Sequence, residues 1–182
     1  MTDKIQTSLR DSAAMRWTAL LLLSLAMFCA YIFVDILSPI KELMQEQRGW
    51  DSTAFGTMQG SETFLNVFVF FLIFAGIILD KMGVRFTAIL SGAVMLAGAL
   101  IKYYAISDSF AGSALDVWFT NNLNHIPVFE QLGVSPFYQG MPASAKVAAC
   151  GFMIFGCGTE MAGITVSRGI VKWFKGREMA LA

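Results

Sequence analysis

The chain has 182 residues, of which 56% are hydrophobic and only 14% are charged. Soluble domains carry about 25% charged residues, so this composition excludes an ordinary soluble domain and predicts a membrane protein with long apolar segments. The formal net charge of zero argues against a nucleic-acid-binding protein.

Four apolar segments predict membrane-spanning helices in an all-α protein, since roughly 20 residues cross a bilayer. They follow a polar N-terminal tail, 1–15, and cover residues 17–40, 53–79, 86–104 and 145–167. Residues 105–144 are too polar to span, so they are expected to form a long outer loop. Residues 176–182 are expected to begin a fifth helix.

Basic residues indicate how these helices are oriented. Lysines and arginines gather in the N-terminal tail, in the turn 80–86 and after residue 167, whereas the opposite helix ends carry fewer. Cytoplasmic loops are enriched in Lys and Arg, so both ends of the chain are expected in the cytoplasm.

Three acidic residues, Asp35, Glu62 and Glu160, lie inside the predicted spans. A carboxylate near the middle of a bilayer costs about 3 kcal/mol on insertion scales, so each must face protein or a water-filled cavity. Tyr31 shares a helix face with Asp35, and Asn66 shares one with Glu62, because residues three or four apart lie on one side. These five residues are the candidate substrate or proton pathway. Hydrogen bonding between helices is the alternative explanation.

The predicted helix 86–104 has no polar stripe. Its one charged residue, Lys102, lies near the helix end and is expected to extend its ammonium group to the membrane surface. Small residues on this helix and on 145–167 predict close helix packing. They are Ala88, Gly92, Ala93, Ala97, Gly151, Gly156, Gly158 and Gly163. Cys29, Cys150 and Cys157 lie in apolar stretches and are expected to be free thiols.

The turn between the second and third predicted helices, "GIILDKMGVRF", spaces glycines and charges in a defined pattern. Gly76, Asp80, Lys81, Gly83 and Arg85 fit G-x-x-x-D-[RK]-x-G-x-R. This pattern resembles the signature that the major facilitator superfamily of transporters carries at the same place.

The C-terminal stretch "WFKGREMALA", with Arg168 upstream of it, resembles the junction of helices 4 and 5 in the same superfamily. Together with Glu160, it is similar to the branch that includes the lysosomal dipeptide transporter and its bacterial relatives.

The resemblance implies a six-helix half-bundle, of which this chain supplies four helices of an incomplete N-terminal half. It also implies alternating access to a central site. The expected substrate is a small molecule such as a sugar, an organic anion or a short peptide, with protons as a coupling ion and no cofactor. The expected place is the bacterial inner membrane. Asp80 is expected to act as a cytoplasmic latch that pairs with Arg168.

A second hypothesis is a small four-helix membrane protein with a structural or assembly role and no transport activity. A membrane enzyme built on Glu160 or His125 is the third. The sequence argues against an enzyme, because neither residue is accompanied by a nucleophile–base pair or a metal constellation.

Overall fold

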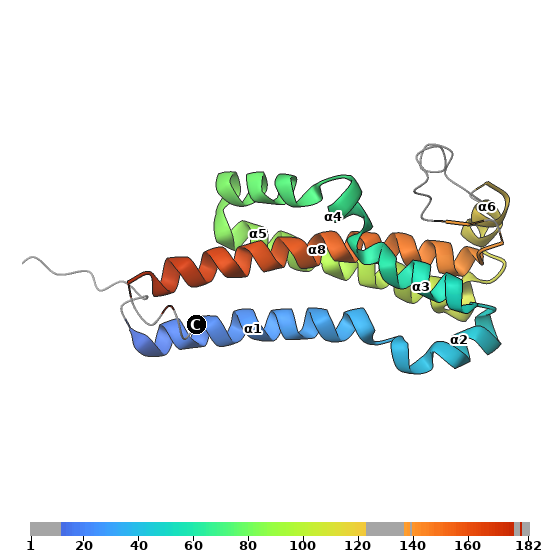
Figure 1. Ribbon diagram of the computed structural model, residues 1–182, viewed down its shortest axis with the longest axis horizontal. Helices are drawn as coiled ribbons and strands as arrows, with labels where there is room; N and C mark the ends of the chain where they lie inside the picture. The colour runs from blue at the N-terminus through green and yellow to red at the C-terminus, as the bar shows by residue number, and fades with distance from the viewer. Residues whose placement is uncertain (1–11, 123–136, 139, 177–178, 180–182) are drawn as a thin grey trace, which may run out of the picture.

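Helices α5 (Phe71–Ile106) and α8 (Ala143–Phe174) form the centre of the protein, and they pack side by side over much of their length (Figure 1). The computed structural model describes residues 12–122, 137–138, 140–176 and 179. All regular secondary structure in these residues is helical. Three helical segments are long and apolar enough to cross a membrane: Ala13–Arg48, Phe71–Ile106 and Ala143–Phe174.

Helix α1 (Ala13–Asp35) begins inside the predicted tail, and residues 1–11 of that tail lie outside the described residues. The helix ends five residues earlier than the predicted 17–40. Proline has no backbone N–H and disfavours the helical conformation of the residue before it, so Pro39 accounts for this end. A short 3-10 helix, η2 (Ser38–Ile40), and helix α2 (Lys41–Arg48) follow.

The segment predicted as one helix over 53–79 is divided into pieces. Helix α3 (Ser52–Gly60) is followed by the 3-10 turn η3 (Ser61–Thr63) and by α4 (Phe64–Phe68). The hydroxyl groups of Ser61 and Thr63 donate to carbonyls three residues back, and such local bonds compete with the helical pattern and bend it. A second break lies at Phe70, whose φ of 54° is left-handed.

Gly83 reverses the chain within α5. Its φ of 81° and ψ of 170° divide α5 into two legs, residues 71–82 and 84–106, which fold back on each other in Figure 1. Glycine takes a positive φ without a Cβ clash, which explains its place in this turn. The turn predicted between the second and third apolar segments is therefore confirmed. The second leg covers the predicted helix 86–104 and continues to Ile106.

Helix α8 is longer than the predicted 145–167 at both ends. The predicted outer loop contains two short helices, η4 (Asp108–Phe110) and α6 (Ala114–Asn122), whereas residues 123–136, including His125, lie outside the described residues. Most of the predicted start of a fifth helix, 176–182, also lies outside them.

Glycines allow α5 and α8 to approach closely. A Cβ on Gly151 would lie 2.8 Å from the Gly98 carbonyl oxygen, and one on Gly98 would collide with the Phe155 backbone. A Cβ on Gly158 would lie 2.8 Å from the Ser91 carbonyl oxygen. The predicted packing role is thus confirmed for Gly151 and Gly158. It is wrong for two of the other predicted glycines, Gly92 and Gly163, which have open space around them.

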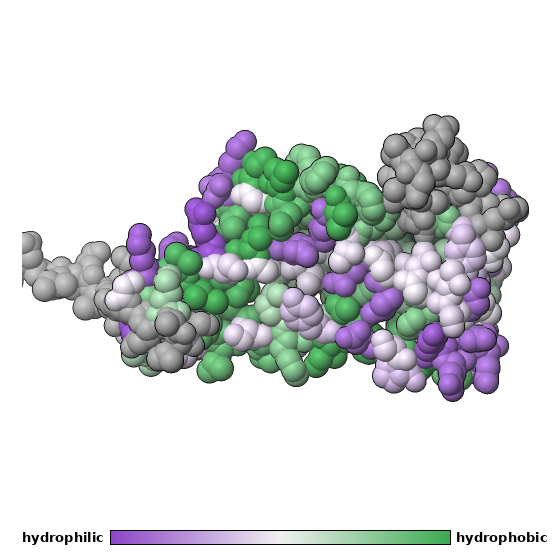
Figure 2. All heavy atoms as spheres, in the orientation of Figure 1, coloured by the Kyte–Doolittle hydropathy of each residue, from purple (hydrophilic) through white to green (hydrophobic). Residues whose placement is uncertain are grey.

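Apolar side chains dominate the outer surface. In the most apolar part of each segment, only 11% of the residues are buried in Ala13–Arg48, against 67% in α8. Figure 2 shows apolar side chains over much of the visible face and hydrophilic ones toward its two ends. Further hydrophilic side chains interrupt the apolar surface near the middle of this face.

Candidate functional site

The polar side chains near the middle of the molecule belong to several helices that meet there. At the end of α1, the Gln59 amide nitrogen donates to the Val34 carbonyl oxygen at 2.9 Å and to an Asp35 carboxylate oxygen at 3.3 Å. These bonds connect α3 to α1. They place Asp35 beside the bent segment formed by η3 and α4, which carries Glu62 and Asn66.

Glu62 and Asn66 lie against α8. A Cβ on Gly156 would collide with the Glu62 carbonyl oxygen, so this glycine lets η3 touch α8. The Asn66 amide nitrogen donates to the Gly156 carbonyl oxygen at 3.4 Å. Glu62 is also close enough to Glu160 and Asp35 to interact with both electrostatically. The structure therefore brings together four of the five predicted pathway residues.

Tyr31 is the fifth predicted residue, and it stays apart from this group. Its side chain is 61% exposed on the open face of α1, one helical turn from Asp35. The Tyr31 side chain therefore lies on the surface of α1 and outside the group formed by the other four residues.

Lys102 is a further polar residue at this place, and the sequence does not single it out as a site residue. Its predicted extension to the membrane surface is wrong, because the residue is only 2% exposed. Its ammonium nitrogen lies 3.7 Å from the ring centroid of Phe152 and 5.1 Å from that of Phe33. It interacts electrostatically with Glu62 and Asp35. Gly98 was the available signal, since it lies one turn earlier on the face that packs on α8.

We define the polar cluster as Asp35, Gln59, Glu62, Asn66, Lys102 and Glu160. It holds three carboxyl groups and one ammonium group. Three of its buried polar atoms, Gln59 Oε1, Asn66 Oδ1 and Lys102 Nζ, have no hydrogen-bond partner among the described residues. Such a cluster can bind ions or polar groups and exchange protons. It offers no nucleophile paired with a base.

The turn at Gly83 places its charges near the end of α8. An Arg168 guanidinium nitrogen lies 3.1 Å from an Asp80 carboxylate oxygen, which is the contact expected from the sequence. Both side chains are more than half exposed. Lys81 and Arg85 flank the turn, whereas Gly76 is helical and has no atom near the position of a Cβ.

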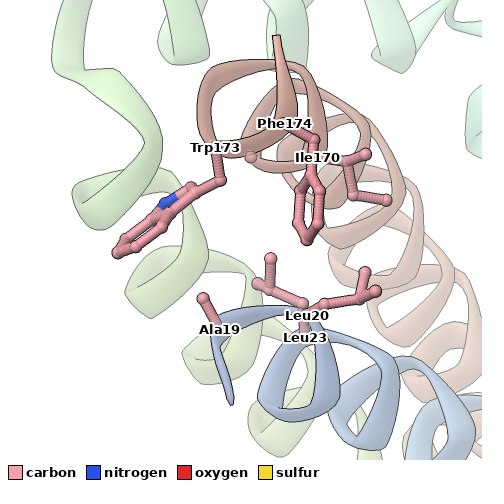
Figure 3. Close-up of a pocket in the computed structure, with 7 residues that line it drawn as sticks. Ala19, Leu20, Leu23, Ile170, Trp173 and Phe174 are labelled. Atoms are coloured by element: carbon pink, nitrogen blue, oxygen red, sulfur yellow. The ribbon is translucent and has the colours of Figure 1, made fainter. Parts of the chain in front are cut away.

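A shallow hollow lies between the start of α1 and the end of α8. Figure 3 shows that its lining is apolar, with Leu20 and Leu23 opposite Ile170 and Phe174. The rings of Trp17 and Phe174 also meet edge to face, with centroids 5.6 Å apart. This seam attaches α1 to α8, and the indole nitrogen of Trp173 is the polar side-chain atom among its lining residues.

Four polar contacts tie the opposite end together. The Trp50 indole nitrogen donates to Ser144 Oγ at 2.8 Å, and Arg48 pairs with Asp108. Asp51 Oδ1 accepts from the Ala54 amide at 2.6 Å and from the Tyr138 hydroxyl at 2.8 Å. The Ala54 bond, followed by the Tyr138 bond, lowers the pKa of Asp51. Burial and the Asp51 contact raise the pKa of Tyr138 to about 12.

A cleft of about 280 Å³ opens at the same end, lined by residues that include Arg48, Asp116 and Ser144. It lies outside the polar cluster and contains none of the predicted pathway residues. Within the described part of the chain, no group of three or more His, Cys, Asp or Glu side chains could hold a metal ion. The three cysteines are free.

Comparison of the chain with models of protein families, with curated proteins and with solved structures finds no match. The function must therefore be argued from the residues and their arrangement.

Proposed function

We propose that this chain acts in a secondary transporter of the major facilitator type, which moves a small polar solute across the bacterial inner membrane by alternating access. The observation that carries the proposal is the polar cluster. Glu62 on η3 interacts electrostatically with Asp35 on α1 and with Glu160 on α8, within a protein whose long helices are apolar enough to span a bilayer. Such groups are expensive in lipid, so they favour a water-filled pathway between helices.

The division of the segment 52–82 supports the same function. Transporters bind solutes beside interrupted helices, where irregular backbone is tolerated because it lines a cavity. Here the interruption at η3 carries Glu62, and α4 carries Asn66. The backbone therefore bends at the residues that the pathway needs.

A fourth crossing of the membrane follows from this segment in the proposed arrangement. The first leg of α5, residues 71–82, is roughly 18 Å long and cannot span a hydrocarbon core of about 30 Å. Joined to α3 and α4, it extends from the end near α2 toward the end where α1 begins (Figure 1). The chain then crosses four times, and both described ends lie on the cytoplasmic side.

The Asp80–Arg168 pair supports a role for the cytoplasmic turn as a latch. The pair joins the turn of α5 to the last part of α8. An exposed pair contributes only about 0–1 kcal/mol, so it can open and close without a large energetic barrier. A weak contact at this place suits a conformational cycle better than a permanent brace.

The test is solute uptake into cells or proteoliposomes, with transport rates measured across a range of pH. Glu160→Gln is expected to abolish uptake or its pH dependence, because it removes a titratable group from the pathway while preserving its size.

Asp80→Asn is expected to slow transport and leave membrane insertion intact. Lys172→Gln, which removes another exposed charge near the end of α8 without touching the pair, is the matched control. Unchanged transport in Glu160→Gln would reject the proposal.

A structural or assembly role is the second candidate. The bonds from Gln59 to Val34 and from Asn66 to Gly156 favour it, because they join helices in the way that interior polar residues do in membrane bundles. If this role is the right one, Asn66→Leu lowers thermal stability and Glu160→Gln has no effect on any solute flux.

A further inference from the structure

We propose that Lys102 binds a carboxylate group of the transported solute, and that the solute also carries hydroxyl or amino donors. The inference deepens the proposed function and rests on it. Lys102 has three N–H donors in a nearly closed environment, and none of them meets an acceptor among the described residues. The rings of Phe33 and Phe152 stabilise the charge but accept no conventional hydrogen bond.

A buried ammonium group without acceptors is costly, and this cost is relieved when an anionic oxygen arrives. The nearby carboxyl groups of Glu62 and Asp35 attract Lys102, but neither forms a hydrogen bond with it. A solute carboxylate that reaches hydrogen-bond distance would therefore compete well for the ammonium group.

The unpartnered amide oxygens define the rest of the solute. The amide nitrogens of Gln59 and Asn66 are committed to backbone carbonyl oxygens, and this fixes both amide orientations. Their oxygens then point at no donor among the described residues. Because an amide oxygen can only accept hydrogen bonds, a solute that binds here is expected to donate O–H or N–H groups to these two oxygens.

The local charge favours a carboxylate over a phosphate. Lys102 is the one basic residue in the polar cluster, alongside three carboxyl groups. A second negative charge on the ligand would add repulsion from Asp35, Glu62 and Glu160 without gaining another cation. A singly charged group is therefore the better fit.

Access to Lys102 requires movement of the end of α1. Phe33 covers the ammonium group from the α1 side, and its ring also contacts that of Phe155 at a centroid distance of 4.7 Å. The polar contacts of this helix end are those of Gln59 with Val34 and Asp35. A small outward shift of the helix end would expose Lys102 on the side of Asp35.

The experiment measures binding to the chain in lipid nanodiscs by thermal stabilisation and calorimetry. The probes are matched pairs in which a carboxylate replaces an alcohol: gluconate with sorbitol, lactate with propanediol, and alanine with alaninol. Acetate and inorganic phosphate complete the set. At least one hydroxy- or amino-carboxylate is expected to bind more tightly than its alcohol partner, than acetate and than phosphate.

Lys102→Met is expected to weaken that binding by at least about tenfold, as for other charged hydrogen bonds. Lys146→Met is the matched control, because Lys146 is equally buried but lies outside the polar cluster. Glu62→Gln is expected to strengthen binding by removing a group that competes for Lys102. Helical content and gel filtration check that each variant is folded.

Equal binding of the alcohols, tighter binding of phosphate, full affinity in Lys102→Met, or the absence of binding by every carboxylate would overturn the assignment of Lys102. None of these outcomes would by itself contradict the proposed transport function. Glu160-dependent uptake of a neutral or cationic solute would keep the proposed function and reject this inference alone.

Discussion

Asp51 shows how a single side chain can connect distant parts of this protein. Asp51 begins α3 as its N-terminal cap and also receives the Tyr138 hydroxyl, so one carboxylate joins two segments that are far apart in sequence. Both bonds favour the ionised form, and together they lower the pKa of Asp51 below its ordinary value of 3.8. Stability from this group is therefore present above that value.

The contribution of Asp51 is expected to be lost as the pH falls from about 4 through the lower folded pKa, because the unfolded carboxyl group binds a proton before the folded one does. Asp51→Ala should lower the thermal midpoint at pH 7 and flatten its decline between pH 5 and pH 3. Asp51→Asn should keep the helix cap but lose the pH dependence. Thermal unfolding in detergent at several pH values measures both effects. A decline with pH that is the same in all three proteins would contradict this role.

At the scale of helices, the contact between α5 and α8 depends on glycine. Gly98 faces the backbone of Gly151 and Phe155, whereas Gly92 on the same helix faces open space. Gly98→Leu should destabilise the protein by about 1–3 kcal/mol or more, because the α8 backbone must move away. Gly92→Leu should be close to neutral. Thermal unfolding distinguishes the two, and equal losses would show that the interface does not depend on close approach.

The sequence predicts apolar segments well, because length and hydropathy are local properties. It does not predict how η3 packs, since the Ser61 bond to the Ala149 carbonyl oxygen and the contact of Glu62 with Gly156 form only in the folded chain. The same limit applies to the polar cluster. Carboxyl groups in apolar runs identify Asp35, Glu62 and Glu160, but Lys102 resembles any lysine near a helix end until α8 covers it.

At the scale of the whole molecule, the beginning of α1, the Gly83 turn and the end of α8 lie toward one end, with α2 at the other (Figure 1). We expect the first end to face the cytoplasm, in line with its basic residues. In a chain whose native cysteines are replaced by alanine, an impermeant maleimide should label Glu46→Cys in intact cells. It should label Lys81→Cys only in inside-out vesicles. Labelling of both positions from one side would refute this orientation.

The sparse burial of α1 bears on how the protein assembles during synthesis. Helix α1 is synthesised before α5 and α8 and belongs to a segment long and apolar enough to cross a membrane, yet only 11% of the most apolar part of that segment is buried. The glycine interface between α5 and α8 cannot form until both of those helices have been made. Helix α1 would then remain in contact with lipid until α8 is complete. It would dock last, through the Trp17–Phe174 contact at one end and the Phe33–Phe155 contact at the other. The docking of α1 is therefore expected to be a late step of assembly.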